Sequence, residues 1–243
     1  MADTPEDSPV FLYIHGGGWV VGDKAFHSLP LLRFLAHKKF VVYSINYRLS
    51  PKVTFPAHLI DCKRALVWIR EVGARQYGGN PQKIVVGGES AGGHLSLMVS
   101  LTQNQPQYQP GFERGDTRVS ACVDLYGVHD FTDAKEQFDS VTKNVTRRFL
   151  EDLIMKKKIT QHYDEFAQAS PTLLLNGLKS SDIPPILSVH GTHDTLIPLR
   201  DSELFHETLK KVREQADDSG KDVLVTYSPP FSRFKETNKA LIF

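Results

Sequence analysis

The sequence lacks several features that would assign it to whole classes of protein. It has only two cysteines, Cys62 and Cys122, so no disulfide framework is expected and a reducing compartment fits best. No apolar run approaches the roughly 18 residues that a membrane-spanning helix needs. The acidic stretch from Met1 to Pro9 has neither the basic start nor the apolar core of a signal peptide. We therefore predict a cytoplasmic protein with no transmembrane segment.

An excess of charge of one sign is also absent. The formal net charge is +1, which gives no electrostatic reason to expect nucleic acid as a partner. Small uncharged substrates remain open. The hydrophobic content of 40% and charged content of 23% are those of an ordinary globular protein. The length of 243 residues allows one or two domains, and we predict a single domain over residues 1–243.

Short apolar runs rich in Val, Ile, Tyr and Phe alternate with amphipathic stretches. The nearly continuous apolar character of these runs is typical of strands buried on both faces. The predicted strands are residues 10–14, 40–45, 83–86, 119–126, 186–189 and 223–227. The predicted helices include residues 61–72, with Lys63 on the polar side, 91–101 and 202–215. This order predicts an α/β fold with a mostly parallel sheet, helices on both faces and functional loops at the carboxyl ends of the strands.

Residues 132–178 break the alternation, since they are polar and helical without a clear strand. We predict a lid-like helical insert, in which Lys156 to Lys158 form a solvated helix face. Residues 228–243 form an atypical C-terminal tail.

The segment Gly-Glu-Ser-Ala-Gly has the pattern of a nucleophile elbow. It follows a predicted strand and opens a predicted helix, which is the context that an elbow requires. Gly88 and Gly92 allow a strained turn that lifts the hydroxyl of Ser90 out of the sheet. A glycine-rich turn that only packs a helix closely on a strand is the alternative.

A second motif, His-Gly-Gly-Gly-Trp, directly follows the first predicted strand, where serine esterases place an oxyanion loop. Its glycines let the backbone approach a ligand. The predicted oxyanion donors are the amides of Gly17, Gly18 and Ala91, with His15 and Gly16 as supporting residues. A phosphate loop is disfavoured, because no Lys-Ser or Lys-Thr follows the glycines.

Asp194 follows the strand predicted at 186–189. This fold places the acid that orients the catalytic histidine after a late strand, in the chain order Ser, Asp, His. A carboxylate that caps the helix near Leu199 is the alternative.

These motifs resemble the alpha/beta hydrolase fold-3 family, the carboxylesterases and lipases that are similar to hormone-sensitive lipase. The matching segments are HGGGW, SINYRLSP with FPA, GESAGGH and HGTHDTLIP, in family order over about residues 10–200. The resemblance implies an α/β-hydrolase fold and hydrolysis of small carboxylic esters through an acyl-enzyme on Ser90, with no metal or organic cofactor. Trp19, Phe26 and the helical insert are candidates for lining the acyl pocket, although aromatic residues near a sheet more often belong to the core.

The chain departs from this family at two places. The family's general base is a histidine after the last strand, and no histidine follows Tyr227. The edge strands that precede the oxyanion loop in the family are not found either. His193 and His206 are weak candidates for a substitute base, His15 and His190 are expected to be structural, and His94 is expected to pack near the elbow.

We therefore predict a serine hydrolase of the carboxylesterase type whose turnover is slow or absent, because a serine without a base is a weak nucleophile. Two kinds of alternative stay open. One is a catalytically inert small-molecule-binding protein or a truncated or spliced isoform. The other is a formamidase-like amide hydrolase that uses the same site, since a fold does not choose between esters and amides.

Overall fold

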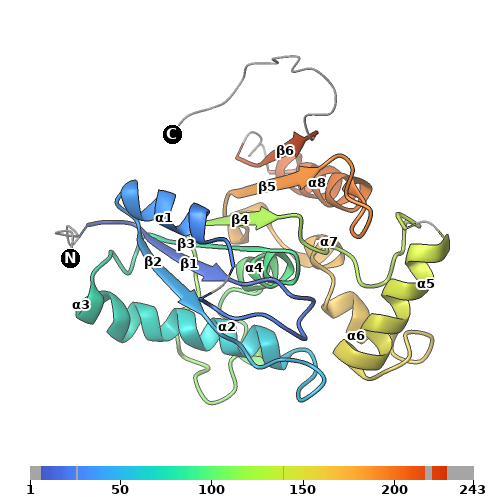
Figure 1. Ribbon diagram of the computed structural model, residues 1–243, viewed down its shortest axis with the longest axis horizontal. Helices are drawn as coiled ribbons and strands as arrows, with labels where there is room; N and C mark the ends of the chain where they lie inside the picture. The colour runs from blue at the N-terminus through green and yellow to red at the C-terminus, as the bar shows by residue number, and fades with distance from the viewer. Residues whose placement is uncertain (1–6, 26, 139, 217–220, 229–243) are drawn as a thin grey trace.

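Six parallel strands form one sheet in the computed structural model, which describes residues 7–25, 27–138, 140–216 and 221–228 (Figure 1). The order across the sheet is β2-β1-β3-β4-β5-β6. The strands are β1 (Val10–Ile14), β2 (Val41–Ile45), β3 (Ile84–Glu89), β4 (Ala121–Leu125), β5 (Ile186–Gly191) and β6 (Val223–Tyr227). All six predicted strands are confirmed, and β3 continues past its predicted end to Glu89.

Helices connect successive strands, as parallel pairing requires. The α-helices are α1 (Leu29–His37), α2 (Ala57–Trp68), α3 (Ala74–Tyr77), α4 (Ala91–Leu101), α5 (Ser140–Phe149), α6 (Tyr163–Gln168), α7 (Pro171–Leu174) and α8 (Leu199–Glu214). Shorter 3₁₀ or π segments are η1 (Ile69–Gly73), η2 (Pro106–Tyr108), η3 (Leu150–Met155), η4 (Leu175–Gly177) and η5 (Ser180–Asp182). The sequence analysis did not identify α1, which is short and begins with a proline in its first turn.

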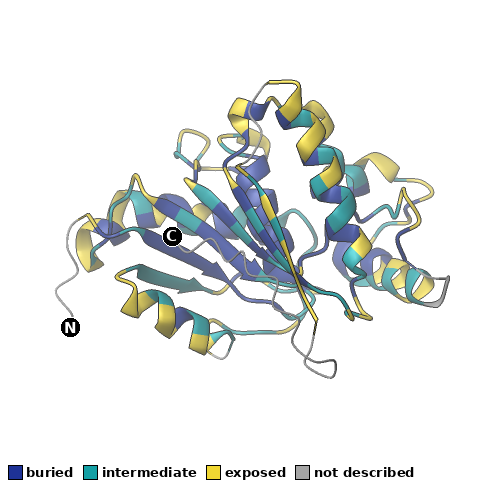
Figure 2. Ribbon diagram, turned by 90° about the horizontal axis from the view of Figure 1, so that it is seen from above, coloured by how far each residue is buried: buried dark blue, intermediate teal, exposed yellow. Residues whose placement is uncertain are grey.

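The strand residues alternate between two packing layers. On one face of β1, Val10, Leu12 and Ile14 join a core that includes residues of α2, α4 and α8. On the other face, Phe11 and Tyr13 pack with Leu32 of α1. Figure 2 shows the sheet between these layers, with its central strands buried. The expected cover of helices on both faces is confirmed.

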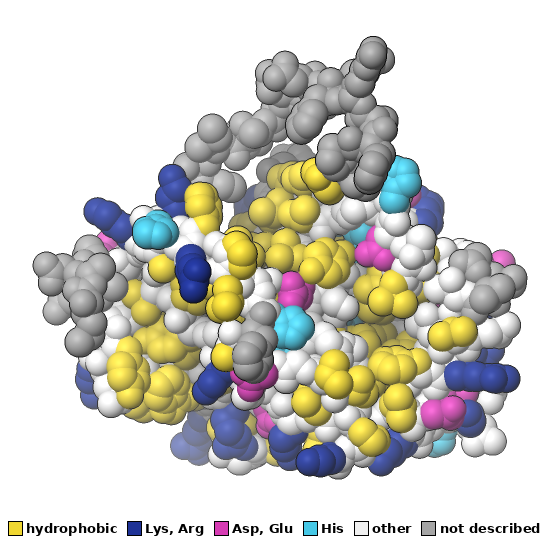
Figure 3. All heavy atoms as spheres, viewed as in Figure 1, with side chains coloured by type: hydrophobic (Ala, Val, Ile, Leu, Met, Phe, Trp, Pro, Cys, Tyr) yellow, Lys and Arg dark blue, Asp and Glu magenta, His cyan; other side chains and the backbone are white. Residues whose placement is uncertain are grey.

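The α1 side of the sheet is less fully covered toward β6. The side chains of Val223, Val225 and Tyr227 are 41%, 44% and 58% exposed. By register they lie on the same face as Leu187 and Val189 of β5. Figure 3 shows hydrophobic side chains gathered on this face. The described helices therefore leave an apolar stretch of sheet open, although parallel sheets are normally covered on both faces.

Residues 132–178 form α5, η3, α6, α7 and η4, with no strand among their described members. The predicted solvated helix face at Lys156 to Lys158 is wrong, because these residues lie in the turn that follows η3. Lys158 pairs there with Glu151 and Asp152. The predicted role of this segment as a lid, and the single-domain organisation, stay predictions. The predicted tail lies outside the described residues from position 229 onward.

The burial of one helical side chain also differs from the prediction. Lys63 of α2, expected on a polar side, is fully buried. Its ammonium donates to the carbonyl oxygen of Thr102, at the end of α4. Within the described residues, no helix is long and apolar enough to cross a membrane.

Candidate active site

Two neighbouring strands bring the two glycine-rich motifs together. Strand β1 pairs in parallel with β3, and Ile14 lies opposite Gly88 in this pairing. The loop that begins at His15 follows β1, and Ser90 follows β3. Because parallel strands end at the same edge of a sheet, both motifs lie at the carboxyl edge, where α/β folds place their sites.

Ser90 occupies a strained turn between β3 and α4. Its backbone has φ 52° and ψ −119°, outside the regions that a side-chain-bearing residue ordinarily adopts. The neighbouring glycines are sterically required: a Cβ on Gly88 would lie 2.3 Å from the carbonyl oxygen of Ile14, and one on Gly92 would lie 2.1 Å from the same oxygen. The turn therefore has the geometry of a nucleophile elbow, with a half-buried serine.

The loop after β1 presents unpaired amides beside this serine. Gly17 and Gly18 have φ values of 106° and 58°, which favour glycine. Neither amide donates a hydrogen bond to a described residue. The amide of Ala91 belongs to the first residue of α4, so it has no acceptor within the helix. The three predicted donors thus have N–H groups that no described acceptor uses, and that of Ala91 lies at the positive end of the α4 dipole.

Gly16 joins the loop to the elbow. A Cβ at this position would lie 2.9 Å from the carbonyl oxygen of Glu89 and 3.5 Å from Cβ of Ser90. The close backbone approach leaves no room for a side chain and fixes the loop against Ser90.

His15 supports the loop through ring stacking and hydrogen bonds. Its ring stacks on Tyr47 with a centroid distance of 4.4 Å, and its Nδ1 lies 2.7 Å from the carbonyl oxygen of Gly16. The Tyr47 hydroxyl donates to the carbonyl oxygen of His15. Burial lowers the pKa of His15. A neutral ring with these contacts acts as a structural support.

Two aromatic side chains proposed for an acyl pocket have different outcomes. Trp19 is 3% exposed and packs edge-on against Phe131 and His94, so it belongs to the core. Phe26 lies outside the described residues. The stacked ring of His94 is buried as well, and its Nε2 lies 2.8 Å from the carbonyl oxygen of Ala169.

Asp194 ends the turn after β5 and uses one carboxylate oxygen locally. Its Oδ1 accepts the amides of Leu196 and Ile197, just before α8. Its Oδ2 lies 3.7 Å from Nε2 of His190 and accepts no hydrogen bond from a described residue. His190 itself is held by Ser202 and Ile197. Asp194 therefore stabilises the turn before α8 and does not cap the helix, whose N-cap residue is Pro198, and its Oδ2 accepts no hydrogen bond from a described residue.

No histidine of the described chain forms a hydrogen bond with the hydroxyl of Ser90. His206 is directed to Ser188 instead, at 2.9 Å, and burial lowers its pKa to about 4. His193 is exposed and contacts the hydroxyl of Thr192. Neither of these candidate bases reaches the nucleophile.

The sequence analysis missed a histidine–carboxylate pair beside the elbow. Nδ1 of His27 lies 2.9 Å from Oε1 of Glu89, the residue directly before Ser90. A second missed cluster is fully buried: His129 contacts Asp124 at 2.9 Å and Asp201 at 3.2 Å. These partners are separated by up to 72 residues, so no local pattern identifies them.

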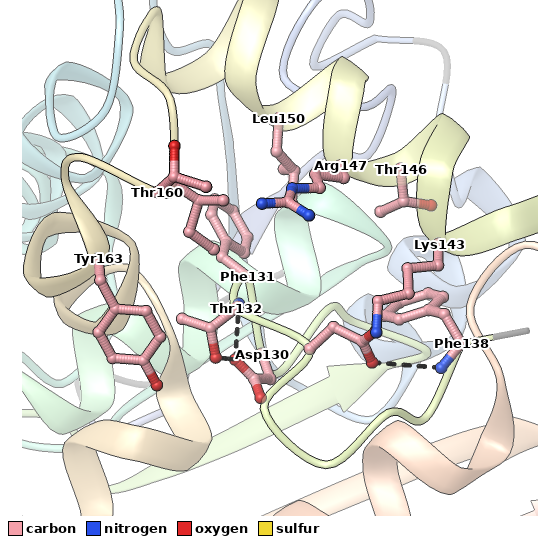
Figure 4. A pocket seen from close by; sticks show the side chains of 12 residues that line it. Asp130, Phe131, Thr132, Phe138, Lys143, Thr146, Arg147, Leu150, Thr160 and Tyr163 are labelled. Atoms are coloured by element: carbon pink, nitrogen blue, oxygen red, sulfur yellow. Dashed lines mark hydrogen bonds and ion pairs between the residues drawn. The ribbon is translucent and has the colours of Figure 1, made fainter. Parts of the chain in front are cut away.

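A cavity of about 290 Å³ lies between α5, α6 and the loop after β4 (Figure 4). Its wall combines the apolar side chains of Phe131 and Leu150 with the cationic groups of Lys143 and Arg147. In Figure 4 the guanidinium of Arg147 points into the cavity. Ser90 is not part of its lining, but Phe149 of α5 touches the oxyanion loop: a Cβ on Gly18 would lie 3.2 Å from its ring.

A serine on a strand–helix elbow, faced by a glycine loop at the edge of a parallel sheet, defines the α/β-hydrolase class. The chain belongs to the BD-FAE family, which matches residues 2–209. This confirms the family of esterases that the motifs resemble.

Two relatives come from Mycobacterium tuberculosis. The probable carboxylic ester hydrolase LipM is 39% identical over 88% of this chain and 47% of its own length. Esterase LipQ is 36% identical over 84% of this chain and 46% of its own length. The chain therefore spans about half the length of the curated relatives it matches.

Solved esterase structures have the same fold. A truncated form of a carbohydrate esterase from gut microbiota superimposes with a TM-score of 0.75 at 25% identity, covering 93% of this chain and 79% of that one. A thermophilic esterase from Thermogutta terrifontis gives a TM-score of 0.72 at 23% identity, covering 93% of this chain and 75% of that one, and shows likeness of fold alone. The names of these proteins favour neither an amide hydrolase nor an inert binding protein.

Proposed function

We propose that this chain is a carboxylic ester hydrolase that cleaves small esters through an acyl-enzyme on Ser90. The observation that carries the proposal is the strained serine turn, with φ 52°, which faces amides that have no described acceptor. The relatives named as esterases support the same activity. A small-molecule ester is the proposed substrate, and no cofactor enters the reaction.

In this reaction Ser90 Oγ attacks the ester carbonyl carbon. The carbonyl oxygen becomes negative in the tetrahedral intermediate, and the amides of Gly17, Gly18 and Ala91 donate hydrogen bonds to it. The alcohol then leaves, and water releases the acid from Ser90 in a second step. One oxygen of Asp194 accepts no hydrogen bond from a described residue and can orient a histidine, but His190, 3.7 Å away, has both ring nitrogens held by Ser202 and Ile197.

The test combines turnover with labelling of the nucleophile. The purified chain is expected to hydrolyse p-nitrophenyl acetate and to be labelled by a fluorophosphonate on Ser90. Ser90→Ala should abolish both signals, whereas Ser181→Ala, which changes an exposed serine, should retain them. Hydrolysis that survives Ser90→Ala would contradict the proposal, as would a folded chain with neither turnover nor labelling.

A further inference from the structure

His27 is paired with a carboxylate that lies directly beside the serine turn. Glu89 directly precedes Ser90, and its carboxylate accepts a hydrogen bond from Nδ1 of His27 across 62 residues of sequence. The Glu89 side chain is 13% exposed and that of His27 is 34% exposed. The carboxylate is therefore largely buried, while the imidazole borders solvent.

Glu89 is held in place by two further donors. The hydroxyl of Ser28 donates to its Oε2 at 2.6 Å, and the hydroxyl of Tyr126 donates at 3.1 Å. Burial raises the pKa of Glu89, but the hydrogen bonds that it accepts outweigh burial and lower this pKa overall. An ionised carboxylate accepts hydrogen bonds only, so the proton of a neutral His27 ring resides on Nδ1. The lone pair on Nε2 then remains available for a proton.

The pair lies in one contiguous cluster with the nucleophile. A Cβ on Gly16 would touch both Cγ of Glu89, at 3.1 Å, and Cβ of Ser90, at 3.5 Å. The His27 ring stacks against His15, at the start of the oxyanion loop, with a centroid distance of 5.9 Å. Within the described residues, no partner binds Nε2 of His27.

The buried histidines other than His129, and the partly buried His206, each use a ring nitrogen on a structural group, although Nε2 of His15 and Nδ1 of His58 and His94 have no partner among the described residues. Their acceptors or donors are structural groups: Gly16 for His15, Ser50 for His58, Ala169 for His94, Ser202 and Ile197 for His190, and Ser188 for His206. His129 uses both nitrogens on carboxylates. A carboxylate on one nitrogen and an open second nitrogen is the arrangement by which a triad orients its base.

We propose that His27, oriented by Glu89, is the general base that serves Ser90 in this chain. In acylation the Ser90 proton moves to Nε2 of His27 while Oγ bonds to the ester carbon. The imidazolium returns that proton to the alcohol oxygen as the carbon–oxygen bond breaks. In deacylation Nε2 takes a proton from the attacking water, and Ser90 Oγ takes it back on leaving.

The proposal requires Nε2 of His27 to come within hydrogen-bond reach of Ser90 Oγ when substrate binds. No hydrogen bond joins the two side chains in the structure, and catalytic hydrogen bonds of free enzymes often tighten only in the substrate complex. His27 lies next to Ser28, which has φ 50° at the start of α1. The inference rests on the proposed esterase function, whose own test is the loss of activity in Ser90→Ala.

The experiment measures kcat, KM and the pH profile for p-nitrophenyl acetate in the full chain. His27→Gln is expected to lower kcat by about 10²- to 10⁴-fold with little change in KM, the usual contribution of a general base. It should also remove the acidic limb of the pH profile. Glu89→Gln should lower kcat as well, because it loses the charge that orients and stabilises the imidazolium. In His27→Ala, added imidazole should restore part of the activity.

His162→Asn is the matched control. His162 and Glu165 form a similar pair at 2.9 Å, at the start of α6, and both side chains are partly exposed. Its removal should leave kcat and the pH profile unchanged. Thermal unfolding of each variant separates a folding defect from a lost base, and imidazole rescue would not follow from a purely structural role.

The failure of this inference is distinguishable from that of the esterase function. Activity that Ser90→Ala abolishes, but that His27→Gln and Glu89→Gln leave intact, would overturn the role of His27 and leave the esterase function standing. Loss of activity in Asp194→Asn together with full activity in His27→Gln would instead assign the base to a histidine that Asp194 orients. A parent chain with neither turnover nor fluorophosphonate labelling would remove both proposals.

Discussion

Gly92 contacts Ile14 backbone to backbone: a methyl group on Gly92 would lie 2.1 Å from the carbonyl oxygen of Ile14. Helix α4 is therefore seated directly on the end of β1. Neither partner in this contact is a flexible side chain, so an added atom at Gly92 forces the helix away from the sheet. The position of Ser90, two residues earlier, changes with it.

Gly92→Ala should destabilise the fold and reduce activity together. Overpacking a close contact costs about 1–3 kcal/mol, which for a chain of this size lowers Tm by roughly 2–12 °C. Differential scanning calorimetry and ester hydrolysis provide the measurements. Gly177→Ala is the control, because no atom lies within 4 Å of its Cβ position. A Gly92→Ala chain with parental Tm and kcat would show that the helix adjusts without cost.

Gly17→Ala should reduce turnover by displacing the oxyanion loop. Its φ of 106° is unfavourable for alanine, and the new Cβ would lie 2.1 Å from the carbonyl oxygen of Val21. Loss of one oxyanion donor typically lowers kcat by about 10²- to 10³-fold. Steady-state kinetics should show the change in kcat with little change in KM. A kcat of Gly17→Ala equal to that of the parent would indicate that Gly17 does not bind the oxyanion.

His129 should make the stability of the fold depend on pH at both extremes. Burial lowers its pKa, but the carboxylates of Asp124 and Asp201 outweigh burial and raise this pKa from 6.5 to about 10. This stabilisation is fully present below pH 6.5 and is lost as the pH rises through 10. Asp124 has a lowered pKa, so its contribution is present above its ordinary value of 3.8 and is lost as the pH falls further.

The measurement for this cluster is urea unfolding between pH 4 and pH 10.5, with His129→Gln beside the parent. Removing one partner from a buried ionic cluster costs about 3–5 kcal/mol of unfolding free energy. The loss should be largest between about pH 4 and pH 6.5 and should shrink as the pH rises from 6.5 through 10, where the parent loses the same charge. His37→Gln, at an exposed site on α1, should behave as the parent does. A pH-independent difference would contradict the ionic account.

Val225→Lys should alter self-association more than stability. Val225 is 44% exposed on the apolar stretch of β6, so a charge there meets solvent and opposes contact between apolar faces. Light scattering as a function of concentration should show less association for the variant than for the parent. Val223→Ala is the control, because it removes bulk on the same face without adding charge. A parent chain that scatters as a monomer at every concentration would leave this face without an associating role.

The strands and both glycine motifs could be predicted because each depends on residues that are close in sequence. Buried parallel strands are continuous apolar runs, and an elbow needs small residues at fixed spacing around Ser90. The side-chain pairs could not be predicted in this way. His27 meets Glu89 across 62 residues, and His129 meets Asp201 across 72. The burial of Lys63 also depends on the end of another helix, at Thr102.

The pairing of Ile14 with Gly88 determines how well the geometry of the site is retained on heating or mutation. The glycine loop at His15 and the proposed nucleophile Ser90 extend from adjacent strands, whose separation is set by backbone hydrogen bonds at about 4.8 Å. The distance between the attacking atom and the anion-stabilising amides is thus a property of the sheet itself. Variation in other loops can change which ligands enter, while the spacing between Ser90 and the glycine loop is kept until the sheet unfolds.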